Sequence, residues 1–179
     1  MEGQDQLEHS RPDRLTRLAK TPEDLADAVR GRDDVALSRR SGPSEWSAKD
    51  VVCHLRDVEE VVILRFHMML AMDDPKLLVL GREPSDPTWG FSQEVPYPMD
   101  PDRWRLERQY ERHDAGAALS AFHRRRGEVL TFLRALSAQQ WERGSIHPSG
   151  ERWAFDDWTA GLARHDDAHL RQLRDVLAG

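Results

Sequence analysis

The sequence has a single cysteine, no long apolar run and no excess of positive charge. One cysteine, Cys53, in 179 residues excludes a disulfide framework and any zinc finger built on cysteines. No stretch approaches the ~18 consecutive apolar residues of a membrane span. The start, Met-Glu-Gly-Gln-Asp, lacks the basic and apolar regions of a secretory signal. We therefore expect a cytoplasmic protein with no membrane partner.

Positive charge is also too scarce for a typical nucleic-acid binder. The chain carries 26 Lys and Arg against 32 Asp and Glu, a formal net charge of −6, whereas nucleic-acid binders usually present a positive face. Two basic clusters, at 39–40 and 124–126, are short and flanked by acids or apolar residues, which favours solvated helix faces. The length and the 39% apolar residues predict one soluble domain over residues 1–179, with residues 1–12 flexible and no nucleic-acid partner.

What the sequence does contain is helical periodicity. Thr21-Pro22-Glu23-Asp24 combines an N-cap residue, a proline and two acids, which predicts a helix start. Ser47, with Asp50 three residues later, predicts a second start, because both side chains suit the free amides there. The predicted helices cover about residues 21–30, 48–72, 114–136 and 156 to nearly the C-terminus. A further turn at Leu15 and Leu18, before the first of them, stays open. Short helical turns are expected at 33–37 and after Ser137.

About 40 residues, 73–113, separate the second and third predicted helices, and they contain six prolines and no sustained period. Loops this long in a compact domain are usually lids, binding segments or flexible connections. If the two helices run parallel, the chain must return along a helix length, which a long crossover does. We expect an all-α four-helix bundle with this proline-rich crossover, whose aromatic residues pack on the bundle, and at most a small hairpin at 144–153.

Three of the eight histidines stand out by their position on a helical face. His165 and His169 lie one turn apart, in register with the apolar residues of the fourth predicted helix. Such a pair can place two imidazole nitrogens on one metal. His54, on the edge of the inner face of the second helix, could complete a three-histidine site with open coordination positions. The alternative is half-buried histidines that bond to carbonyls or acids.

Two segments resemble motifs of a known family. Glu45-Trp-Ser-Ala-Lys-Asp-Val-Val-Cys-His54-Leu is similar to the Trp-Ser-x-x-Glu/Asp-x-x-x-His-Leu helix start of the DinB-like (YfiT-like) metalloenzymes. His165-Asp-Asp-Ala-His169-Leu-Arg-Gln172 looks like their H-D-x-x-H-x-x-Q, and His147-Pro-Ser-Gly is a weaker match. The resemblance covers essentially residues 20–178, in order and spacing.

The resemblance implies an up-down-down-up four-helix bundle with a divalent metal ion at one end. Carried over, the ligands are His54, His165 and His169, and Trp46 and Asp50 match positions that look structural. Zn, Ni, Fe and Mn all accept histidine ligands. The resemblance also implies a small-molecule substrate, frequent homodimers and, in some members, a low-molecular-weight thiol as cosubstrate.

Other candidate residues each have two interpretations. Arg126 could hold an anionic substrate or extend to water at the bundle end. His147 could be a fourth ligand, an acid or base, or an ordinary loop histidine. Cys53 points about 100° away from His54 around the helix, which favours packing. Three carboxylates could orient the imidazoles or face water: Asp57, Asp166 and Asp167.

A divalent ion held by three neutral imidazoles keeps a charge of about +2, which favours hydroxide or thiolate as a further ligand. We therefore expect a metal-dependent enzyme that activates water or a thiol for hydrolysis or transfer. Two alternatives stay open: a metal-dependent sensor or ligand carrier without turnover, and a structural dimer with an empty site. The lack of a separate acid or base in the sequence favours the sensor.

Overall fold

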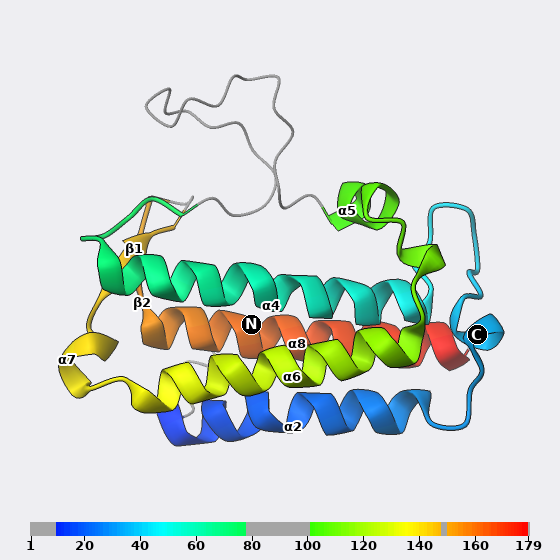
Figure 1. Cartoon of the computed structure of the whole chain (residues 1–179), viewed down its shortest axis with the longest axis horizontal. Helices are drawn as coiled ribbons and strands as arrows, with labels where there is room; N and C mark the ends of the chain where they lie inside the picture. The colour runs from blue at the N-terminus through cyan, green and yellow to red at the C-terminus, as the bar shows by residue number, and fades with distance from the viewer. Residues whose placement is uncertain (1–9, 78–100, 148–149, 179) are drawn as a thin grey trace.

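Four long helices form most of the computed structural model, which describes residues 10–77, 101–147 and 150–178 (Figure 1). The long helices are α2 (Arg11–Val29), α4 (Ala48–Ala71), α6 (Ala115–Ala135) and α8 (Phe155–Ala178). Shorter helices are α3 (Asp34–Leu37), α5 (Pro101–Glu107), the 3-10 helix η2 (Tyr110–Arg112) and α7 (Ala138–Trp141). Strands β1 (Gly144–Ile146) and β2 (Arg152–Ala154) form the expected antiparallel hairpin.

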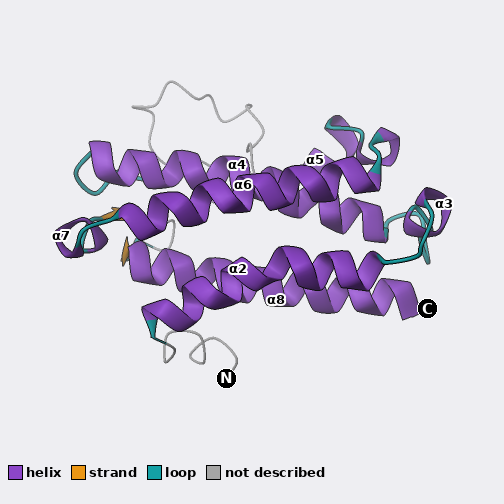
Figure 2. Ribbon diagram, turned by 60° about the horizontal axis from the view of Figure 1, so that its bottom comes forward, coloured by secondary structure: helices purple, strands orange, loops and turns teal. Residues whose placement is uncertain are grey.

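The four long helices run up-down-down-up. In Figure 1, α2 and α8 run in one direction, and α4 and α6 run in the other. Helix α4 packs against α6 and α8, and α2 packs against the same two helices. Figure 2 shows the α4–α6 pair lying over the α2–α8 pair. The predicted all-α four-helix bundle, with a long connection between two parallel helices, is therefore confirmed.

The start of α4 matches its prediction. The Ser47 hydroxyl accepts a hydrogen bond from the Asp50 amide at 3.1 Å, and the Asp50 carboxylate accepts one from the Ser47 amide at 2.9 Å. Arg40 also pairs with Asp50, at 3.0 Å. Because both capping groups are buried, they fix the helical turn that leads to His54. The predicted starts of α6 and α7, at Asp114 and Ser137, are equally confirmed.

The first helix begins ten residues before its predicted start. Ser10 caps α2, and Pro22 lies inside the helix. The Thr21 hydroxyl donates to Asp166 Oδ2 at 2.7 Å instead of capping the chain. Leu18 and Leu25 are fully buried on either side of the proline, and this packing outweighs the backbone hydrogen bond that proline removes. Residues 10–12 form the N-cap and the first turn of α2, and residues 1–9 lie outside the described residues, so the flexibility of residues 1–12 stays a prediction.

Part of the predicted loop 73–113 is helical. Residues 101–112 contain α5 and η2, because Trp104 and Tyr110 are buried against the bundle. Trp104 therefore packs as expected, and Tyr110 packs in the same way. The other aromatic residues of the crossover, Trp89, Phe91 and Tyr97, lie outside the described residues.

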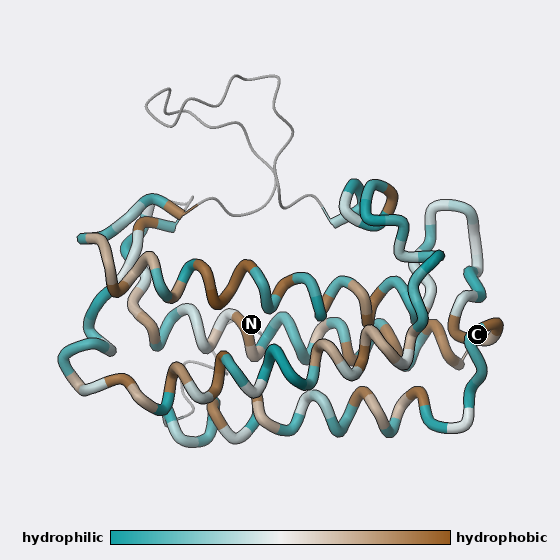
Figure 3. The backbone as a smooth tube through the Cα atoms, viewed as in Figure 1, coloured by the Kyte–Doolittle hydropathy of each residue, from teal (hydrophilic) through white to brown (hydrophobic). Residues whose placement is uncertain are grey.

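A polar layer divides the core into two apolar clusters. One cluster surrounds Leu55 and Phe122, and the other surrounds Phe66 and Phe155. Between them each long helix contributes buried polar side chains, and Figure 3 shows a hydrophilic stretch near the middle of α6. The layer contains Thr21, His54, Glu59, Arg126 and Asp166. The histidine site was expected at one end of the bundle, but His165 lies near the middle of α8.

Candidate metal centre

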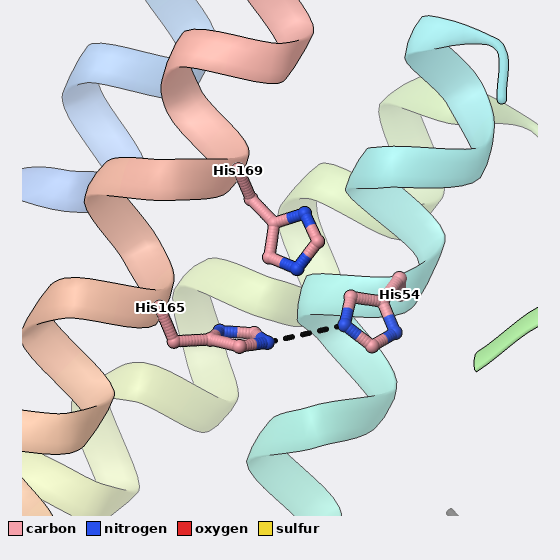
Figure 4. Close-up of side chains that lie close together, drawn as sticks. All are labelled: His54, His165 and His169. Carbon is pink, nitrogen blue, oxygen red and sulfur yellow. Dashed lines mark hydrogen bonds between the residues drawn. The ribbon is translucent and has the colours of Figure 1, made fainter. Parts of the chain in front are cut away.

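His54 on α4 and His165 and His169 on α8 direct their rings into the space between the two helices (Figure 4). The Nε2 atoms of His54 and His165 lie 3.2 Å apart, within hydrogen-bond distance, and the dashed line in Figure 4 marks this contact. Each ring offers one nitrogen, and the three nitrogens lie within 4.8 Å of one another. Among the residues that the structure describes, no other cluster of His, Cys, Asp or Glu side chains has this geometry. The three predicted histidines therefore meet in one place.

The donor atoms fit a metal ion. Two nitrogens bound at 2.0–2.1 Å in a tetrahedral site lie roughly 3.4 Å apart, close to the 3.2 Å between His54 and His165. The Nδ1 atoms of these two residues are buried and have no hydrogen-bond partner within the described ranges. If both protons lie on Nδ1, two lone pairs face each other, and a cation between them relieves the repulsion. Three protein donors leave at least one coordination position open.

Burial keeps two of these imidazoles neutral at pH 7. Desolvation lowers the pKa of His54 to about 2, and the nearby His165 and His169 act in the same direction. Desolvation also lowers the pKa of His169 to about 4, again with a contribution from His165. Because a metal binds the neutral imidazole, these two residues require no deprotonation at neutral pH.

Two neighbouring side chains orient the rings. His169 Nδ1 lies 2.7 Å from the amide oxygen of Gln172, which can only accept, so the proton lies on Nδ1 and the Nε2 lone pair is available. Trp46 packs its ring edge-on to His54, with centroids 5.2 Å apart, and stacks on His169 at 6.1 Å. Its Nε1 donates to Asp102 of α5 at 2.7 Å. Trp46 therefore connects the site to the end of the crossover.

The three carboxylates considered as partners of the imidazoles accept hydrogen bonds from other groups. Asp57 accepts from Arg56 at 2.7 Å and from the Tyr110 hydroxyl at 2.9 Å. Asp167 accepts from Arg17 at 2.7 Å. The third carboxylate, Asp166, accepts from Arg126 and Thr21. Burial acts to raise the pKa of Asp166, but Arg126 and the adjacent His165 imidazole lower it. Gln172 instead accepts the hydrogen bond that orients His169. Gln172 belongs to the sequence motif, but the motif alone assigned it no function.

Arg126 has neither of its two expected environments, because its guanidinium is buried inside the bundle with 1% exposure. It donates to Glu59 at 2.7 and 2.9 Å, to Asp166 at 2.6 and 3.1 Å and to the Leu18 carbonyl at 3.0 Å. Burial acts to lower the pKa of Arg126, but Asp166 and Glu59 raise it. The residue is therefore a charged link between four helices, and the structure does not support a substrate-binding role.

A largely apolar pocket of about 260 Å³ adjoins the histidines, and His54 and His165 form part of its wall. His147 lies in the same wall and stacks on Trp153, with centroids 3.9 Å apart and planes 9° apart. It is not a member of the three-histidine cluster. Cys53 is fully buried in an apolar cluster, and burial raises its pKa to about 12, as expected for a packing residue.

The fold and the cluster define a class: up-down-down-up four-helix bundles with three histidines meeting between two helices. Residues 17–173 match the family model described as the DinB superfamily, and the chain belongs to that superfamily. It is 24% identical over 160 residues to a Bacillus subtilis (strain 168) protein named "Putative metal-dependent hydrolase YfiT", covering 87% of this chain and 79% of that protein.

The solved structure of YfiT from Bacillus subtilis, described as having an unusual four-helix bundle topology, is also similar. Its TM-score is 0.75 at 21% identity, and the match covers 94% of this chain and 87% of that one. This likeness supports the fold. Within the three described ranges, every helix is too short or too polar to cross a bilayer.

Proposed function

We propose that the protein is a metal-dependent hydrolase in which His54, His165 and His169 hold one divalent ion. The observation that carries this proposal is the convergence of three imidazole nitrogens within 4.8 Å, beside a pocket large enough for a small molecule. The name of the Bacillus subtilis relative, a metal-dependent hydrolase, supports the same reaction class. Zn, Ni, Fe and Mn all suit the donor set.

A bound divalent ion would supply a hydroxide at neutral pH by lowering the pKa of a coordinated water, towards ~7 in the case of zinc. The protein's own groups hold and orient the site. Gln172 keeps the His169 proton on Nδ1, and Trp46 packs against two of the three rings. The apolar pocket would exclude bulk water and place the scissile bond of a small substrate beside His54 and His165.

Thiol transfer is a second candidate, because the neutral donor set suits it as well as hydrolysis. Because the three imidazoles add no negative charge, the ion would stabilise a thiolate as well as a hydroxide. A low-molecular-weight thiol would then be the cosubstrate. The homodimer and the cytoplasmic location stay predictions.

The test is turnover with and without metal. Purified protein reconstituted with Zn, Ni, Fe or Mn is assayed on small aryl esters, alone and with a panel of small thiols. We expect hydrolysis at least 100-fold above that of chelator-treated protein, lost in His165→Ala and retained in His123→Ala, which changes an exposed histidine of α6. Turnover that requires a thiol would identify the transferase instead.

Two outcomes would contradict the proposed enzymatic function. Stoichiometric metal without turnover of any ester or thiol pair would favour the sensor or ligand carrier. A dimer that binds no metal would favour the structural alternative.

A further inference from the structure

The pocket beside the histidines has walls suited to an apolar ligand of bicyclic size. Its volume is about 260 Å³, whereas an engineered cavity of ~150 Å³ binds benzene. Helix α4 contributes Val58 and Phe66, and α8 contributes Trp158 and Leu162. Trp153 of the hairpin meets Trp158 edge to face, with centroids 5.0 Å apart. A flat, apolar body would therefore lie among aromatic rings.

The charged groups in the wall are positive. Two arginines line the pocket, and its described lining contains no carboxylate. Arg65 lies over the Trp158 ring, with its guanidinium carbon 5.2 Å from the centroid. Arg164 immediately precedes His165 on α8. A pocket with this charge favours an anionic ligand over a neutral or cationic one.

Arg164 is part of the pocket lining, and its guanidinium has an unused donor. Its Nη1 is buried and has no hydrogen-bond partner among the described residues. A Cβ added at Gly161, one turn earlier, would lie 3.4 Å from the Trp153 ring and 3.8 Å from Arg164 Nη2. The guanidinium and the indole therefore both lie close to the bare backbone of Gly161. An anion at Nη1 would satisfy the donor while its apolar body contacts the indole.

We propose that this pocket selects small substrates with a flat apolar body and a carboxylate, and that Arg164 binds the carboxylate. The reaction of such a substrate rests on the proposed hydrolase function, but its recognition does not, because Arg164 is separate from the three histidines. A carboxylate bound to the metal ion is the competing explanation for any preference for acids. The experiment must therefore measure binding in the absence of metal.

The probes are 2-naphthoate and 2-naphthamide, which have the same shape and differ in charge. Binding is measured by calorimetry on chelator-treated protein. For the wild type, we expect the acid to bind at least tenfold more tightly than the amide. For Arg164→Gln, we expect the acid and the amide to bind with equal affinity. The matched control is Arg171→Gln, which removes the same charge from an exposed position of α8 and should keep the preference. Arg164→Lys should keep at least a threefold preference.

Without metal, any of four results would overturn the proposal: no binding of either probe to the wild type, equal affinities for both, a preference that survives in Arg164→Gln, or a Lys variant that binds both probes equally. A preference for the acid that appears with metal and disappears with chelator would assign the carboxylate to the ion, and would also overturn it. Absence of the proposed hydrolase activity would be seen in the turnover assay and would leave these binding affinities unchanged, so the two proposals can fail independently.

Discussion

The Nε2 atoms of His54 and His165 lie 3.2 Å apart, although 111 positions separate the two residues in the chain. The approach is possible because α4 and α8 are antiparallel neighbours in the bundle (Figures 1 and 4). The same packing leaves the Nδ1 atoms of both rings without hydrogen-bond partners in the described structure. If both rings carry their proton on Nδ1, a shared cation relieves the repulsion between the two Nε2 lone pairs, which leads to the first prediction.

One divalent ion should bind per chain, and each of His54→Ala, His165→Ala and His169→Ala should remove it. Two remaining imidazoles cannot close the site, so we expect at least a 100-fold loss of affinity in each variant. Plasma emission analysis after dialysis measures the stoichiometry, and competition with a chromogenic chelator measures the affinity. His123→Ala is the matched control and should keep the wild-type values. Full metal content in any of the three variants would contradict the shared site.

Gln172→Leu should weaken metal binding without abolishing it. The Gln172 amide oxygen holds the proton of His169 on Nδ1, and loss of such a partner typically costs 10–100-fold in metal affinity. Stoichiometry at saturating metal should stay at one ion per chain. The control is Gln139→Leu, at an exposed position of α7. Unchanged affinity in Gln172→Leu would mean that the ring of His169 needs no such orientation.

Local patterns predicted two parts of the histidine cluster, and the resemblance to the DinB-like family implied that the two parts meet. The 3.6-residue period places His165 and His169 on one face, and the Ser47–Asp50 capping box fixes where the turn with His54 begins. The start of α2 was predicted wrongly, because Thr21-Pro22 has the local pattern of a helix start. The burial of the residues around it outweighs this pattern, and that burial depends on the other helices.

The role of Arg126 could not be predicted for a similar reason. Its partners Glu59 and Asp166 lie on two other helices, and their arrangement around one guanidinium depends on how the helices are rotated about their axes. Helical periodicity identifies an inner face but not the partner that a charged residue meets there. The same holds for Arg164, whose place in the pocket depends on Trp153 of the hairpin and on the absence of a side chain at Gly161.

The metal-free protein should lose stability as the pH falls from 6.5 towards 4. The folded state holds the pKa of His54 at about 2 and that of His169 at about 4, mainly through desolvation, whereas an unfolded histidine has a pKa of about 6.5. Below pH ~6.5 the unfolded chain therefore binds more protons than the folded one, and stability falls. Carboxylates with lowered pKa, such as Asp57, contribute to acid unfolding only nearer pH ~4.

Urea unfolding of chelator-treated protein at pH 7 and pH 5 measures this effect. We expect the free energy of unfolding to drop by on the order of 2 kcal/mol for each of the two histidines. The drop should shrink in His54→Leu, which removes one of the two groups, and stay at the wild-type value in His123→Leu. Equal drops in all three proteins would show that these buried histidines do not control the acid response.

Arg126→Leu should be among the most destabilising single changes in the chain. The guanidinium compensates two carboxylates that are fully buried, Glu59 and Asp166. Removing one partner of a buried ion pair typically costs ~3–5 kcal/mol, since the remaining charge stays without water or a counter-ion. Burial already raises the pKa of Glu59, so this carboxyl would take up a proton in the variant and recover part of the loss.

The free energy of unfolding in urea, measured at pH 7, tests this expectation. Arg124→Leu is the control, because Arg124 is an exposed neighbour on α6 and its loss should change stability by less than about 0.5 kcal/mol. Metal affinity should fall in Arg126→Leu as well, because Asp166 holds the turn of α8 that carries His165. A loss below about 1 kcal/mol would mean that the bundle tolerates two unpaired carboxyls in its polar layer, and that Arg126 does not fix the spacing of α4 and α8 on which the three histidines depend.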